Sequence, residues 1–129
     1  MGQSRKTTDK VLVEVQSRYL PEHSIPVASR WMFAYTICIT NHRRDKIQLL
    51  SRHWIITDAN GSTQEVHGDG VVGEQPVILP GLSYEYTSFC PLESNFGTMH
   101  GSYRMIDAQG RPFMVEIAPF SLDIPHTIH

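Results

Sequence analysis

The fold is indicated most directly by residues 31–40, which read WMFAYTICIT. Aromatic and β-branched side chains dominate this run, and such residues fit the pleated surface of a β-strand. Side chains alternate between the two faces of a strand. One face therefore carries the bulkier set, which consists of Trp31, Phe33, Tyr35, Ile37 and Ile39. We predict a long strand here, with one bulky face and one face of smaller residues.

Similar strand signals recur along the chain and are separated by Gly, Pro and Asn, while no helical stretch stands out. The expected strands cover residues 11–19, 31–40, 47–58, 62–66, 76–79, 82–91, 99–107 and 113–117. Asn60-Gly61 predicts a tight hairpin turn, and residues 108–110 form a similar tip. About seven or eight strands that are neighbours in sequence predict an all-β antiparallel sandwich or barrel. The unequal strand lengths and the short chain favour the sandwich.

Composition sets further limits. The 129 residues suit one domain, and 40% hydrophobic with 19% charged residues is typical of a globular protein. A net charge of −2 argues against non-specific binding to nucleic acid and gives no reason to sit on an anionic membrane. No run of apolar residues is long enough for a membrane span. We expect a cytoplasmic protein, with a flexible N-terminal tail over 1–10, one domain over 11–124 and a C-terminal tail over 125–129.

The two cysteines, Cys38 and Cys90, flank Trp54 in the order found in immunoglobulin domains. Thiols in the cytosol stay reduced, however. Cys38 also falls on the smaller face of its strand. We therefore expect two free thiols.

No arrangement of residues indicates catalysis, so we expect no catalytic residue and no enzyme. There is no G-x-S-x-G elbow, and Ser51 and His53 share a face without a visible orienting acid. The seven histidines stand at positions 23, 42, 53, 67, 100, 126 and 129. No two have the spacing that places two ligands on one face. A set drawn from distant strands, such as His53, His67 and His100, remains open, but the spacing predicts no metal site and no cofactor.

Residues 68–73 match the pattern G-x-G-x-x-G through Gly68, Gly70 and Gly73. That pattern binds dinucleotides where it links a strand to the start of a helix. Here Pro76 and Pro80 follow, so a glycine loop between strands is favoured over a dinucleotide site. Consecutive free N–H groups in such a loop can still bind an anion. The three glycines are therefore kept as a candidate anion or pyrophosphate site.

Four stretches resemble the bacterial ApaG family: residues 48–58, 68–76, 86–88 and 97–103. The resemblance extends from about Val11 to Leu122. It implies a fibronectin type III-like, and thus immunoglobulin-like, β-sandwich with no established enzymatic activity. It also implies a genetic link to diadenosine tetraphosphate hydrolase, a loose link to cobalt and magnesium resistance, and relatives that look like interaction modules. The family's glycine motif, suggested to bind pyrophosphate, is retained here.

Two aromatic residues, Phe89 and Phe96, depart from the family pattern and could expose apolar surface or pack on each other. The basic turn around Arg43 and Arg44 is either a solvated hairpin tip or a contact for an acidic partner. The leading hypothesis is a non-catalytic module that binds a protein partner through Arg43, Arg44 and Phe96 or through an edge strand. The alternative is a nucleotide or polyphosphate binder that acts through residues 68–73. A weaker alternative is a role linked to cobalt or magnesium.

Overall fold

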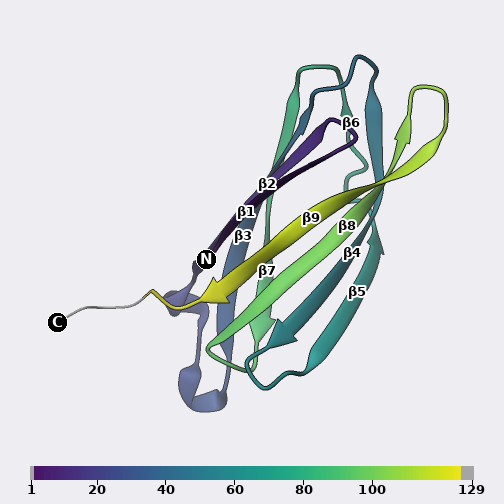
Figure 1. Cartoon of the computed structure of the whole chain (residues 1–129). Helices are drawn as coiled ribbons and strands as arrows, with labels where there is room; N and C mark the ends of the chain where they lie inside the picture. The colour runs from purple at the N-terminus through teal and green to yellow at the C-terminus, as the bar shows by residue number, and fades with distance from the viewer. Residues whose placement is uncertain (1, 126–129) are drawn as a thin grey trace.

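The structure, a computed structural model, describes residues 2–125 as a two-layer β-sandwich (Figure 1). Its nine strands are β1 Gln3–Thr8, β2 Val11–Tyr19, β3 Trp31–Asn41, β4 Ile47–Asp58, β5 Thr63–Asp69, β6 Val77–Ile78, β7 Ser83–Leu92, β8 Phe96–Asp107 and β9 Pro112–Asp123. Two short 3-10 turns, η1 Pro21–His23 and η2 Pro26–Ala28, lie between β2 and β3. The predicted all-β antiparallel sandwich is confirmed.

The strands form two antiparallel sheets. One has the order β1-β2-β3-β7, and the other has the order β5-β4-β8-β9 with β6 paired to β4. Within residues 2–125, no helix is long and apolar enough to cross a membrane.

The prediction of a flexible tail over residues 1–10 is wrong for residues 3–8, which form β1. This strand pairs with β2 in continuous register from Gln3–Gln16 to Thr8–Val11. Most of its side chains are exposed, so it lacks the hydrophobic alternation that marks a half-buried strand in a sequence. The pairing raises the strand count above the expected seven or eight. Residues 126–129 of the predicted C-terminal tail lie outside the described residues.

The hydrophobic core lies between the sheets and includes the bulky face of β3. Phe33, Tyr35, Ile37 and Ile39 are buried there, whereas Trp31 is only partly buried. The facing sheet contributes Trp54, Tyr103 and Phe120, which are at most 2% exposed. Alternation along β3 thus identified the bulky buried face as the sequence predicted, and on the other face Ala34 is also buried, at 1% exposed.

The two long sides of the sandwich differ. On one side β1 covers β9: the ammonium of Lys6 lies 2.7 Å from the carboxylate of Glu116, and the Ser4 hydroxyl donates to the Ala118 carbonyl at 2.8 Å. On the other side β5 and β7 are each the last strand of their sheet. In the described chain, no ion pair or hydrogen bond like those between β1 and β9 joins these two edges. The candidate site lies on the surface between them.

Two irregularities decide which side chains reach that surface. In β4 the register with β8 shifts between Leu49 and Ser51. One extra residue reverses the alternation, so Arg52 joins Trp54 and Ile56 on the inner face while Ser51 and His53 point outward. The β4–β5 connection has a three-residue loop in which only Gly61 has a positive φ, 84°. The expected hairpin turn at Asn60-Gly61 is thus present, and its length sets Thr57 opposite Thr63 and His53 opposite His67.

Candidate functional site

A hollow of about 340 Å³ lies between the edge strands β5 and β7. Its lining comes from both sheets: Tyr35, Arg52, Asp69, residues 71–73 and residues 86–89. The glycine loop thus forms one wall, and the outer strand of the opposite sheet forms the other.

Arg52 connects the hollow to the glycine loop. Its Nη1 donates to the carbonyls of Asp69 at 3.1 Å and Gly70 at 2.9 Å. A Cβ at Gly68 would come within 2.6 Å of this guanidinium. Gly68 therefore serves close packing, because it lets the arginine cross the strand at contact distance.

The glycine loop closes as a tight turn and not as the start of a helix. Val71 and Glu74 exchange backbone hydrogen bonds at 2.8 and 3.0 Å, and both residues between them, Val72 and Gly73, have positive φ. This is a hairpin-type turn, and the next regular element is the short strand β6. The expectation that these letters do not make a dinucleotide site is therefore supported by the backbone.

The loop offers little to a phosphate. Among the described residues, the N–H groups of Val72 and Gly73 have no internal acceptor, so they are free for an anion. The Gly70 N–H donates to the Leu50 carbonyl at 2.8 Å, and Arg52 Nη1 is held by loop carbonyls. Of the three predicted glycines, Gly73 presents a free N–H and Gly70 uses its N–H in the bond to Leu50. Gly68 has the packing role described above.

The buried polar groups near the hollow are phenols and a thiol in neutral form. The Tyr86 and Tyr103 hydroxyls lie 2.6 Å apart, and burial raises the pKa of both well above the ordinary value. Burial also raises the pKa of the Cys90 thiol to about 12. Cys38 and Cys90 are both free, as expected. These groups pack and do not ionise near neutral pH, so they supply neither a base nor a thiolate nucleophile.

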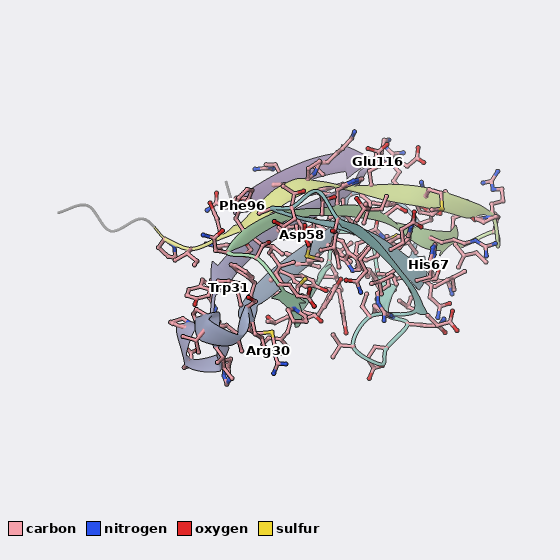
Figure 2. All side chains as sticks on the ribbon, turned by 90° about the horizontal axis from the view of Figure 1, so that it is seen from below. Arg30, Trp31, Asp58, His67, Phe96 and Glu116 are labelled. Carbon is pink, nitrogen blue, oxygen red and sulfur yellow. The ribbon has the colours of Figure 1, made fainter. Side chains whose placement is uncertain are left out.

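The three predicted partner contacts do not form one surface. Arg43 lies near Asp107 at one end of β8, and Phe96 begins β8 at the other end. Phe96 and Asp107 are eleven residue steps apart along β8, which corresponds to about 35 Å. Figure 2 shows Phe96 near one end of the sandwich, far from His67.

Arg43 and Arg44 also differ in environment. Arg43 binds Asp45 with two nitrogens, at 2.8 and 3.2 Å, and its guanidinium lies 4.9 Å from the Phe113 ring centre. The pKa of Asp45 is lowered by this hydrogen bond to Arg43. Arg44 and Phe96 are exposed. Arg44 and Phe96 are therefore accessible to a partner, whereas the Arg43 side chain is held in contacts within the protein.

This difference gives a paired prediction. We expect Arg43→Ala to lower the midpoint of urea denaturation measurably, since Asp45 would lose its partner. Arg44→Ala should change the free energy of unfolding by less than about 0.5 kcal/mol, as is usual at a surface position. Equal effects of the two substitutions would contradict the assignment of Arg43 as structural.

A group that sequence spacing did not indicate lies on the outer face of β4 and β5. It consists of His53, Glu65 and His67, whose ligand atoms all lie within 4.8 Å of one another. His100, the third histidine considered with them, is not part of this group. The missed signal was Glu65-Val66-His67, because an acidic residue two positions from a histidine shares its face in a strand.

These features define a small antiparallel β-sandwich that presents two open edges, a mixed hollow and a histidine–carboxylate group on one outer face. A family model described as the ApaG domain matches residues 21–107. The chain belongs to the ApaG family.

Curated relatives and solved structures agree with this assignment. Protein ApaG of Methylobacterium sp. (strain 4-46) is 54% identical over 119 residues, which is 92% of each chain. Protein ApaG of Proteus mirabilis is 52% identical over 95% of this chain and 98% of its own. A crystal structure from Bordetella pertussis, described as an ApaA protein, is 48% identical with a TM-score of 0.89, and covers 96% of this chain and 100% of its own.

Proposed function

We propose that the protein is a non-catalytic module that binds a protein partner by accepting an extended segment along the free edge of β7. The observation that carries this proposal is the character of that edge. β7 is ten residues long and, within residues 2–125, pairs only with β3. It contains a single charged residue, Glu85, and Phe89 is 59% exposed. An open edge of this kind is a template for an added strand.

Comparison with the other sheet edges supports β7. β1 carries Arg5 and Lys6, and charged side chains discourage pairing with a further strand. β9 contains Pro112 and Pro119 and is covered by β1. β5 is seven residues long and carries Glu65 and Asp69. Of the four, β7 has the least protection against pairing.

The hydrogen-bond pattern shows which backbone N–H and C=O groups of β7 face its free edge. The Asn41 N–H donates to the Leu82 carbonyl, and antiparallel pairs alternate between bonded and non-bonded residues. Even-numbered residues of β7 therefore bond to β3, and residues 83, 85, 87 and 89 direct their backbone groups to the free edge. The backbone of Pro91 also faces the free edge, where a residue without an N–H is tolerated.

The hollow beside this edge adds a place for a partner side chain. Residues 86–89 of β7 line it together with Tyr35, Arg52 and the glycine loop. A strand added to β7 would run past this mixed polar and aromatic lining. Backbone pairing would supply affinity and the hollow would supply selectivity.

Replacing Thr87 tests this proposal with a matched control at one position. Thr87→Pro removes an outward N–H, whereas Thr87→Ala removes the side chain and keeps the N–H. We expect proteins recovered from a cell lysate with the wild-type chain to be recovered with Thr87→Ala and lost with Thr87→Pro. Circular dichroism of both variants checks that they fold.

Hydrogen exchange with a recovered partner gives a second readout. The partner should slow exchange at the amides of residues 85, 87 and 89 and leave those of β5 unchanged. Binding that survives Thr87→Pro, or protection confined to another edge, would overturn the proposal.

Phosphate binding through residues 68–73 has less support. Its basis is the free N–H groups of Val72 and Gly73 near Arg52. Without a following helix there is no helix dipole to favour an anion, and the Arg52 guanidinium is already held by the loop carbonyls of Asp69 and Gly70. We therefore prefer the protein-binding function.

A further inference from the structure

The cluster of His53, Glu65 and His67 follows from strand register. The Asp58 N–H donates to the Ser62 carbonyl and the Gly70 N–H to the Leu50 carbonyl. Even-numbered residues of β4 therefore bond to β5, and His53 and His67 form a non-hydrogen-bonded pair. The Cα atoms of such pairs approach to about 4.5 Å, so their side chains lie close together. The two imidazole rings are stacked with centres 4.0 Å apart and planes 9° apart.

Glu65 brings a carboxylate to the same point. It precedes His67 by two residues, so it lies on the same face of β5. Its Oε2 lies 3.2 Å from Nε2 of His53 and 3.4 Å from Nε2 of His67. A metal ion with tetrahedral geometry and bonds of 2.0 to 2.2 Å separates neighbouring ligand atoms by about 3.4 Å. Both nitrogen–oxygen distances to the carboxylate thus match the separation expected between two ligand atoms of a tetrahedral site.

We propose that His53, Glu65 and His67 form a binding site for a divalent transition-metal ion such as Zn²⁺. Two imidazole nitrogens and one carboxylate oxygen are ligands that zinc accepts, with a further position left for water. Mg²⁺ prefers six oxygen ligands and is disfavoured by this set. The site is independent of the β7 edge, because it lies on the other sheet.

Exposure and charge favour entry of an ion. The side chains of His67 and Glu65 are 67% and 58% exposed, and that of His53 is 32% exposed. The Glu65 carboxylate adds a negative charge beside the two imidazoles, which attracts a cation. The two rings are parallel at present, and binding requires that they tilt until their in-plane lone pairs converge on the ion. Arg104 lines the same surface hollow and opposes a cation, which moderates the affinity.

Calorimetric titration with zinc chloride tests the site on the full chain. We expect one Zn²⁺ per chain, and we expect His53→Ala and His67→Ala each to raise the dissociation constant about ten-fold or more, since each removes one of three ligands. Glu65→Gln should also weaken binding. His42→Ala is the matched control, because His42 is an exposed histidine in the β3–β4 turn outside the cluster, and it should leave the constant unchanged.

Two further measurements separate this site from binding by unrelated histidines. The titration is repeated on a chain with His126→Ala and His129→Ala, which removes two other imidazoles, and the single site should persist. In nitrogen-15 spectra, zinc should shift Nε2 of His53 and His67. Absence of one-to-one binding, or an equal loss with His42→Ala and His67→Ala, would overturn the proposal.

Discussion

Trp54→Ala is expected to lower the free energy of unfolding by about 3–5 kcal/mol. Trp54 is 2% exposed. Its ring meets Tyr35 of the opposite sheet edge-on at 5.3 Å and Phe120 of its own sheet at 5.9 Å. Truncation would leave a cavity where the two sheets meet, because neighbouring strands cannot close on it without breaking their ladders. Urea denaturation measures the loss.

Trp54→Phe is the control for this prediction. The Nε1 of Trp54 is buried and has no hydrogen-bond acceptor among the described residues. Phenylalanine removes this unsatisfied donor and keeps an aromatic ring, so it should cost less than half as much as alanine. A loss below about 1 kcal/mol for Trp54→Ala would show that the tryptophan does not hold the sheets together.

Gly70→Ala is expected to cost about 2–4 kcal/mol through backbone strain and a steric clash. Gly70 has a φ of 63°, a conformation that side-chain-bearing residues rarely adopt. A Cβ at this position would collide with the carbonyl oxygen of Glu74. That carbonyl accepts the Val71 N–H across the turn, so moving it would open the glycine loop.

Gly73 in the same turn provides a matched comparison. Its φ is 79°, but a Cβ there would have no atom within 4 Å. Gly73→Ala should therefore cost only the strain of the left-handed conformation, about 1–2 kcal/mol. Equal losses for the two alanine variants in urea denaturation would contradict the role assigned to the Glu74 carbonyl.

The prediction of the fold succeeded where local pattern and tertiary environment agree. Alternation in residues 31–40 identified the buried face of β3, because a strand that covers a core must place its apolar residues two apart. The predicted span of β4 matches its observed bounds. The prolines after residues 68–73 also indicated that no helix follows, since proline lacks the N–H that a helix interior needs.

The candidate site was less predictable, because it depends on register. The sequence predicted a hairpin turn at Asn60-Gly61 but did not predict which residues of the two strands lie opposite each other. The observed three-residue loop pairs His53 with His67. A shift of one residue moves every side chain of a strand to the other face. Local sequence suggests the turn, but the balance of packing along β4 and β5 selects its length.

The sequence by itself determined a sandwich, its principal strands, the free thiols and a glycine loop without a helix. Only the tertiary structure decided that residues 3–8 form a strand, because a polar edge strand is held by backbone pairing and by Lys6 and Ser4 contacts to β9. It also separated Arg43 from Phe96 by the length of β8 and brought His53, Glu65 and His67 together. Strand faces are local properties of the chain, whereas pairing and register are properties of two strands at once.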